Sequence, residues 1–174
     1  IYFFCISFFI FIFDKLNLQH MRVQSVLNND IIEDIINNTQ VAYLSTIDDE
    51  GNPYVVPMNF AYEDGIIYMH SGQKGKKINY MTKHPFVRIA FSNSEILGYQ
   101  SENVACSYYM KYKSAIVEGF VNFIEDFDTK IIYLNKIMKK YTGRSDYQYN
   151  KPSIDNVVVF TIKITKMTGK TLGY

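Results

Sequence analysis

One short stretch of the sequence gathers residues that could bind an anion. The stretch MHSGQKGKK holds one histidine, two glycines and three lysines between a strand-like run and a helix-like run. Glycines let a backbone approach a ligand closely, and a helix start offers free N–H groups and a positive dipole end. Two interpretations are open, a phosphate-binding loop or a solvated basic turn. The residues that would bind phosphate are Ser71, Gly72, Gly75, Lys76 and Lys77.

The histidine of this stretch, His70, ends the strand-like run. Its imidazole could exchange protons near neutral pH or stack on a planar ligand. On its own, a histidine at a strand end more often has an ordinary polar role. The other histidines, His20 and His84, lie in unrelated contexts, and neither a metal-ligand spacing nor a nucleophile elbow is visible in the sequence. We therefore expect no metal site.

Length and composition indicate one globular domain. The chain has 174 residues, of which 48% are hydrophobic and 20% charged, and its formal net charge is +1. So small a charge gives no general reason to expect a nucleic-acid partner. Cys5 and Cys106 form no metal-ligand spacing, and we interpret them as reduced thiols of a cytoplasmic protein.

The first twenty residues differ in composition from the rest. The run IYFFCISFFIFIF is almost wholly apolar, but it is shorter than the ~20 residues that a membrane-spanning helix needs. It also lacks the positive region and the small-residue cleavage site of a signal peptide. We interpret residues 1–20 as upstream sequence or a gene-model artefact before a natural start at Met21; the alternative is a hydrophobic anchor. We expect no membrane association of the domain over residues 21–174.

Hydrophobic periodicity over that domain predicts a mainly β protein of the α+β class. Strand-like runs occupy residues 41–47, 54–62, 66–71, 86–92, 108–126 and 156–169. Helical spacing occupies residues 30–38, 76–84 and 128–142. Six antiparallel strands with a few helices favour a small β-barrel decorated by helices.

Three details of this pattern are specific expectations. The polar residues 93–107 predict an irregular loop. Gly119, inside a long strand, predicts a bulge or a bend. Lys139 and Lys140 are expected to be solvated at the C-terminal end of the last helix, where the helix dipole favours positive charge.

The run from Val41 to Phe91 resembles the flavin-binding split-barrel proteins related to pyridoxamine 5'-phosphate oxidase, and is most similar to the Nim-type, nitroimidazole-resistance branch. The residues that carry this resemblance are Ser45, Thr46, Gly51, Pro53, Tyr54, Pro57, His70, Ser71, Gly75, Lys76 and Lys77. The later run KYKSAIVEGFVNFIED and the ending KMTGKTLGY are similar to the same branch, with matches at Tyr112, Ser114, Gly119 and Asp126. The resemblance implies a six-stranded antiparallel split β-barrel of Greek-key topology with flanking helices.

The resemblance also implies a cofactor and its site. Proteins of this family are homodimers that bind FMN in a cleft between the two barrels. The implied flavin-lining residues are Val56, Pro57, Met58 and Asn59, with His70 and Ser71 beside the flavin. Gly75, Lys76 and Lys77 would bind the FMN phosphate, and Ser114 would join the phosphate or ribityl contacts. The implied catalytic residue is His70.

The implied activity is that of a cytoplasmic FMN-dependent oxidoreductase reducing a small organic acceptor such as a nitro-aromatic compound. The electron donor, NADH or NADPH, would dock transiently, because no Rossmann glycine pattern is visible. The chain has no Trp and so lacks the Arg- and Trp-rich ending of pyridoxamine phosphate oxidases proper, which argues against vitamin B6 oxidation. Two alternatives remain: a flavin-binding or sensing protein without turnover, and a haem-handling split-barrel relative.

Overall fold

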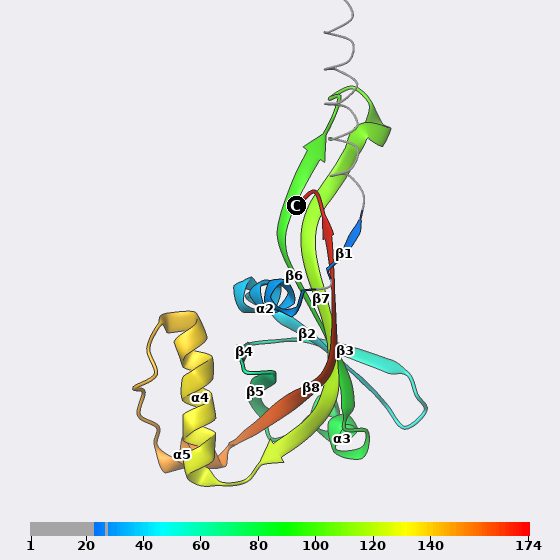
Figure 1. The fold of residues 1–174 in the computed structure, drawn as a ribbon. Helices are drawn as coiled ribbons and strands as arrows, with labels where there is room; N and C mark the ends of the chain where they lie inside the picture. The colour runs from blue at the N-terminus through cyan, green and yellow to red at the C-terminus, as the bar shows by residue number, and fades with distance from the viewer. Residues whose placement is uncertain (1–22, 27) are drawn as a thin grey trace, which may run out of the picture.

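One antiparallel sheet forms the frame of the protein (Figure 1). The computed structural model describes residues 23–26 and 28–174, and within them eight strands follow the order β3-β2-β6-β7-β8-β5-β4, with β1 paired to β8. The strands are β1 (Gln24–Val26), β2 (Ala42–Ile47), β3 (Pro53–Met58), β4 (Phe60–Glu63), β5 (Ile66–Gly72), β6 (Phe86–Tyr99), β7 (Tyr108–Ile124) and β8 (Val157–Leu172). Because β3 and β4 end this order at opposite edges, the sheet is open, as in a split barrel.

Four α-helices and one short 3₁₀ helix accompany the sheet in the described part of the chain. They are α2 (Asn29–Asn38), α3 (Lys76–Lys83), η1 (Ala105–Ser107), α4 (Phe127–Thr142) and α5 (Lys151–Asp155). The mainly β prediction with flanking helices is thus confirmed. The six predicted strands become eight because the second run breaks at Asn59 into β3 and β4, and because β1 adds a short edge strand.

The core follows from the alternation of side chains along the strands. In β2, Ala42, Leu44 and Thr46 face inward while the residues between them are more exposed, so one face of the strand is buried. Apolar side chains of α2 close the same core, since Ile35 and Ile36 are fully buried. The largest fully buried side chains include Phe60, Phe91, Phe160 and Met81, which come from three strands and α3.

The prediction of an irregular loop over residues 93–107 is wrong for much of its length. Strand β6 continues to Tyr99, which pairs with Tyr108 at the start of β7. The two strands form an arm that projects beyond the helices in Figure 1, with one register shift between Asn93 and Ile96. The polar composition misled the prediction because this arm is largely exposed, and backbone pairing alone requires no apolar face.

The bulge predicted at Gly119 is confirmed. Glu118 pairs with Lys166 but Gly119 pairs with Ile164, so β8 has one extra residue at this point. A Cβ atom on Gly119 would lie 2.2 Å from the backbone oxygen of Lys163. The glycine therefore permits the close approach of β7 and β8.

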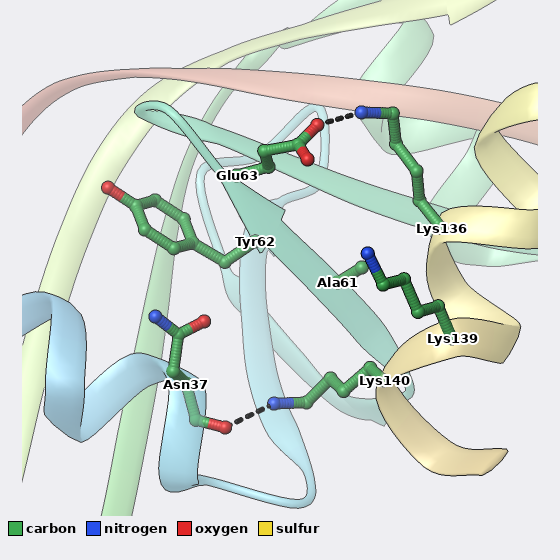
Figure 2. A pocket seen from close by; sticks show the side chains of 7 residues that line it. All are labelled: Asn37, Ala61, Tyr62, Glu63, Lys136, Lys139 and Lys140. Atoms are coloured by element: carbon green, nitrogen blue, oxygen red, sulfur yellow. Dashed lines mark hydrogen bonds and ion pairs between the residues drawn. The ribbon is translucent and has the colours of Figure 1, made fainter. Parts of the chain in front are cut away.

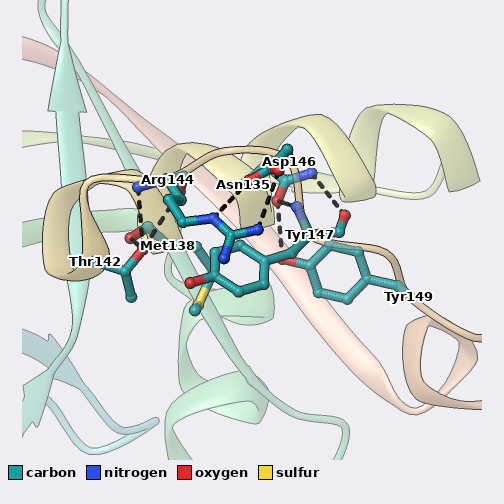
Figure 3. Close-up of polar contacts among 7 residues, drawn as sticks. All are labelled: Asn135, Met138, Thr142, Arg144, Asp146, Tyr147 and Tyr149. Carbon is teal, nitrogen blue, oxygen red and sulfur yellow. Dashed lines mark hydrogen bonds and ion pairs between the residues drawn. The ribbon is translucent and has the colours of Figure 1, made fainter.

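Polar contacts fix the segment that follows α4 (Figure 3). The Asn135 side-chain oxygen accepts hydrogen bonds from the Tyr147 backbone N–H at 3.2 Å and the Tyr149 hydroxyl at 3.4 Å. Arg144 donates two hydrogen bonds, each 3.0 Å, to the carboxylate of Asp146. These contacts fold the segment back along α4 toward α5, a short helix that the sequence pattern did not predict.

Replacement of Gly119 by alanine is expected to destabilise the fold by about 2 kcal/mol, because the new methyl group cannot be accommodated without separating β7 from β8. Chemical denaturation of the full chain measures the change. Gly72→Ala is the matched control, since a Cβ atom on Gly72 meets no atom within 4 Å. Equal destabilisation by the two substitutions would contradict the close approach at Gly119.

Candidate functional site

The end of β5 and the start of α3 lie only a few residues apart in the chain. The connection turns at Gly75, whose φ of +134° and ψ of 163° lie in a region that only glycine adopts readily. A Cβ atom on Gly75 would meet no atom within 4 Å, so the backbone conformation and not crowding requires glycine there. The Gly75 carbonyl accepts hydrogen bonds from the N–H groups of Ile78 at 3.2 Å and Asn79 at 3.3 Å, which begins the helix.

The first turn of α3 is electrostatically unfavourable without a ligand. Lys76 and Lys77 are its first two residues, the turn has no acidic side chain, and no side chain caps it. Because a helix N-terminus carries partial positive charge, two lysines there oppose the helix dipole. The first N–H groups of a helix also lack intrahelical acceptors. This combination suits a bound anion, which both the lysines and the N–H groups would stabilise.

His70 lies next to this helix start with an unsatisfied nitrogen. Its Nδ1 atom is buried and has no hydrogen-bond partner in the described residues. Burial, and secondarily the positive charge of Lys77, lower the pKa of the His70 imidazole below its usual value of 6.5. The imidazole is therefore neutral at pH 7. A buried, unpaired nitrogen is costly in a folded protein, so a ligand that bonded to it would remove a penalty.

Strand β3 and the residue after it present two of the predicted flavin-lining residues to the outside and two to the core. Met58 is buried, and Val56 packs against the same core, whereas Pro57 and Asn59 are exposed. Side chains of Pro57 and Asn59, together with the backbone of the other two residues, are thus available to a ligand. Phe60 of β4 pairs with Met69 of β5. Asn59 precedes Phe60 and His70 follows Met69, so both lie next to this pair and are neighbours across the two strands.

An aromatic contact connects β3 to α3. The rings of Tyr54 and Tyr80 meet edge to face with centroids 5.5 Å apart. At the far end of α3, Asp49 in the turn between β2 and β3 contacts both Lys83 and His84, with the His84 Nε2 atom at 3.3 Å. Tyr80 could not be paired with Tyr54 from the sequence, because the two residues are distant in the chain and no spacing signal links them.

Ser114 lies apart from the other predicted site residues. It pairs with Ser92 on β6, and its hydroxyl donates to the Lys170 carbonyl at 3.4 Å. His70 pairs with Val159 and Ser114 pairs with Lys170, so the two residues are separated by eleven residues along β8, which corresponds to about 35 Å along the strand. The structure places Asn59 and Lys77 near His70, but not Ser114 with them.

Other sequence expectations concern different parts of the chain. Cys106 is exposed and unpaired, while Cys5, His20 and the apolar extension of residues 1–20 lie outside the described residues. Over residues 23–26 and 28–174, no three His, Cys, Asp or Glu side chains are grouped so that they could hold one metal ion. Among the helices described, none is long and apolar enough to span a bilayer.

Comparison with known proteins assigns the family. The family described as Pyridoxamine 5'-phosphate oxidase matches residues 28–171 of the chain. A candidate 5-nitroimidazole antibiotic resistance protein from Bacteroides thetaiotaomicron is 39% identical, with a TM-score of 0.78, over 86% of this chain and 87% of that one. No curated protein is significantly similar in sequence.

Two more distant solved structures share the fold. An FAD-binding protein from Mesorhizobium loti is 25% identical, with a TM-score of 0.63, over 87% of this chain and 99% of that one. An FAD and haem binding protein from Mycobacterium smegmatis has a TM-score of 0.75 at 14% identity, over 86% of this chain and 74% of that one. The chain belongs to the split-barrel family related to pyridoxamine 5'-phosphate oxidase, and within it to the nitroimidazole-resistance branch.

Proposed function

We propose that this protein is an FMN-dependent oxidoreductase that reduces a small organic acceptor, such as a nitro-aromatic compound. The observation that carries the proposal is the position of His70 close to Lys77, at a helix start suited to bind an anion. The buried Nδ1 atom of His70 has no partner in the described residues. The 39% identity to a candidate 5-nitroimidazole antibiotic resistance protein supports the choice of acceptor. The FAD-binding relative from Mesorhizobium loti supports a flavin as cofactor.

The residues at the start of α3 fit the phosphate end of FMN. Lys76 and Lys77 supply positive charge, and the first N–H groups of the helix supply donors. The open space beside Gly75 lets a phosphate approach the backbone. Ser71 is only 7% exposed, so it would contribute mainly through its backbone. In this proposal the unfavourable charge at the helix start is neutralised by the cofactor.

The residues of β3 and β5 fit the flat end of the cofactor. Pro57 and Asn59 offer exposed side chains, and Val56 and Met58 offer backbone. His70, on β5, lies next to the same Phe60–Met69 pair that Asn59 adjoins. FMN, when bound, supplies the redox chemistry of the reaction. The neutral imidazole of His70 can hold a proton on one ring nitrogen and accept a hydrogen bond at the other. We assign His70 to positioning the acceptor and moving a proton to it.

The outer face of the sheet supports the proposal of a homodimer with FMN at the interface. Large apolar side chains are exposed on neighbouring strands, and they form cross-strand rows: Phe86 opposite Phe120, and Tyr43 and Ile116 on either side of Ala90. An apolar surface of this kind marks a contact site. The row through Tyr43 continues to Pro57 on β3, so the residues proposed to line the flavin border the proposed interface.

FMN binding is the first test. We expect the purified full-length chain to show flavin absorption bands and to release FMN, identified by mass. Lys77→Gln should raise the dissociation constant for added FMN about tenfold, because a charged contact to phosphate is lost. Lys74→Gln, which removes an equal charge from the same loop, is the control. A chain that takes up no FMN would refute the proposed function.

His70→Ala is expected to bind FMN normally but to reduce a nitro-aromatic acceptor about a hundredfold more slowly. The rate is measured by mixing dithionite-reduced, FMN-loaded protein with a 5-nitroimidazole under nitrogen. His84→Ala, which alters an exposed histidine at the other end of α3, is the control. An unchanged rate in the His70 variant would remove this residue from the reaction.

The titration of His70 gives an independent check of its environment. Proton NMR of the imidazole should give a midpoint below 6.5 in the folded protein. Since the folded state then binds fewer protons than the unfolded state, His70 lowers stability as the pH falls below 6.5. A midpoint at or above 6.5 would contradict the buried, unpaired environment.

A charged substitution on the outer face of the sheet tests the proposed interface. Phe120→Asp, on the outer face of β7, should convert a dimer to a monomer in light scattering coupled to gel filtration, because a carboxylate cannot be buried there without a partner. Ile132→Asp on α4 is the matched control, since Ile132 is 55% exposed and Phe120 53%. A monomeric native protein, or dissociation by both variants, would count against this interface.

A further inference from the structure

A second basic site lies between α2, β4 and α4 (Figure 2). It is a cavity of about 350 Å³, within the range of small-molecule sites. Asn37 from α2 and Ala61, Tyr62 and Glu63 from β4 line one side. Three lysines of α4, Lys136, Lys139 and Lys140, line the other. None of these residues belongs to the loop and helix start that we assign to FMN, so the cavity is a separate site.

The cavity carries an excess of positive charge. Three lysines face one carboxylate among the lining residues, which leaves a formal charge of +2. Lys136 pairs with Glu63 and lies 5.0 Å from the centre of the Tyr68 ring. Since Lys136 and Lys140 are one helical turn apart, their like charges repel each other. A bound anion would relieve that repulsion.

Lys140 contradicts the expectation of a solvated helix end, because it is half-buried. Burial lowers the pKa of its ammonium group below the usual range. Its Nζ atom donates to the Asn37 carbonyl at 2.7 Å and lies 4.4 Å from the centre of the Phe60 ring. A carbonyl and a ring face compensate a buried charge only in part, and the described residues around Lys140 give it no carboxylate partner.

Lys139 and Tyr62 complete the arrangement. In Figure 2 the Lys139 ammonium group points into the space between Lys136 and Lys140, and no ion pair or hydrogen bond engages it within the described chain. The Tyr62 hydroxyl is anchored, because it accepts a hydrogen bond from the Gly65 N–H at 3.2 Å. The Tyr62 ring therefore serves as a fixed wall of the cavity.

We infer that this cavity binds a phosphate group, either as free phosphate or as the monoester of a small metabolite. A phosphate monoester carries a charge of about −1.5 to −2 at pH 7, which matches the excess of the cavity. Lysine ammonium groups bind phosphate as point charges and need no bidentate geometry. Because α2, β4 and α4 each contribute, the bound anion would join three elements that are distant in the sequence.

The test is a titration of the isotope-labelled full chain with inorganic phosphate at constant ionic strength, followed by backbone amide NMR. We expect saturable shifts at Asn37, at residues 61–63 and along the second half of α4, and none with chloride. Lys139→Gln should weaken this binding about tenfold, because one charged contact is lost. Lys163→Gln, an exposed lysine of β8, is the control and should leave the affinity unchanged.

The outcomes separate this site from the proposed FMN site. Shifts confined to residues 75–77 would mean that phosphate binds only at the start of α3 and would overturn the inference. Equal weakening by Lys139→Gln and Lys163→Gln, or an absence of saturable shifts, would do the same. A parallel titration with glycerol 3-phosphate distinguishes the source of the anion: tighter binding than inorganic phosphate would identify a monoester as the ligand, and equal binding would identify phosphate itself.

Discussion

The pairing of β5 on both of its edges is the constraint on which the candidate site depends. Strand β5 pairs with β4 as far as Met69 and with β8 as far as Gly72, so the strand as a whole cannot shift without breaking two ladders. His70 is fixed in this way, opposite Val159. Because β5 ends at Gly72 and α3 begins at Lys76, the chain has three residues in which to turn, and Gly75 supplies the conformation that such a turn needs. The lysines at the helix start are consequently held beside the histidine.

Several locally unfavourable features coincide at this place. A buried nitrogen without a partner, two lysines at the positive end of a helix and a backbone conformation open only to glycine each cost stability. A sequence that is otherwise consistent with its fold tolerates such conflicts mainly where a ligand resolves them. By contrast, α2 is capped by Asn28 and α4 by Asp126 with helix-start hydrogen bonds of 2.8 Å. Away from this segment, the Thr46 hydroxyl on β2 is also buried without a partner in the described residues. The concentration of conflicts in this short segment is therefore the structural argument for the proposed binding site.

The sequence predicted those parts of the molecule that depend on local pattern. Alternation identified β2, and the run from Phe86 identified the buried half of β6, because each has one face in the core. The arm beyond Asn93 was missed, since its apolar side chains, such as Ile96 and Leu97, are exposed on successive residues and show no alternation between a buried and an exposed face. The cavity between α2 and α4 was missed for another reason: Lys140 becomes buried only when α2 and β4 pack against α4, and no spacing in α4 indicates that contact.

The two basic sites differ in how strongly they need a ligand. At the start of α3 the lysines and the helix dipole have the same sign, so an anion would neutralise both. On α4 the lysines lie toward the C-terminal end, where the dipole favours them, and Glu63 and the Asn37 carbonyl already compensate two of the three. Binding to the folded state alone stabilises a protein according to ligand concentration and affinity. Under the proposed function, loss of the anion at α3 would thus expose a larger internal repulsion than loss of an anion at α4, so the loop after β5 would depend more strongly on its ligand than α4 does.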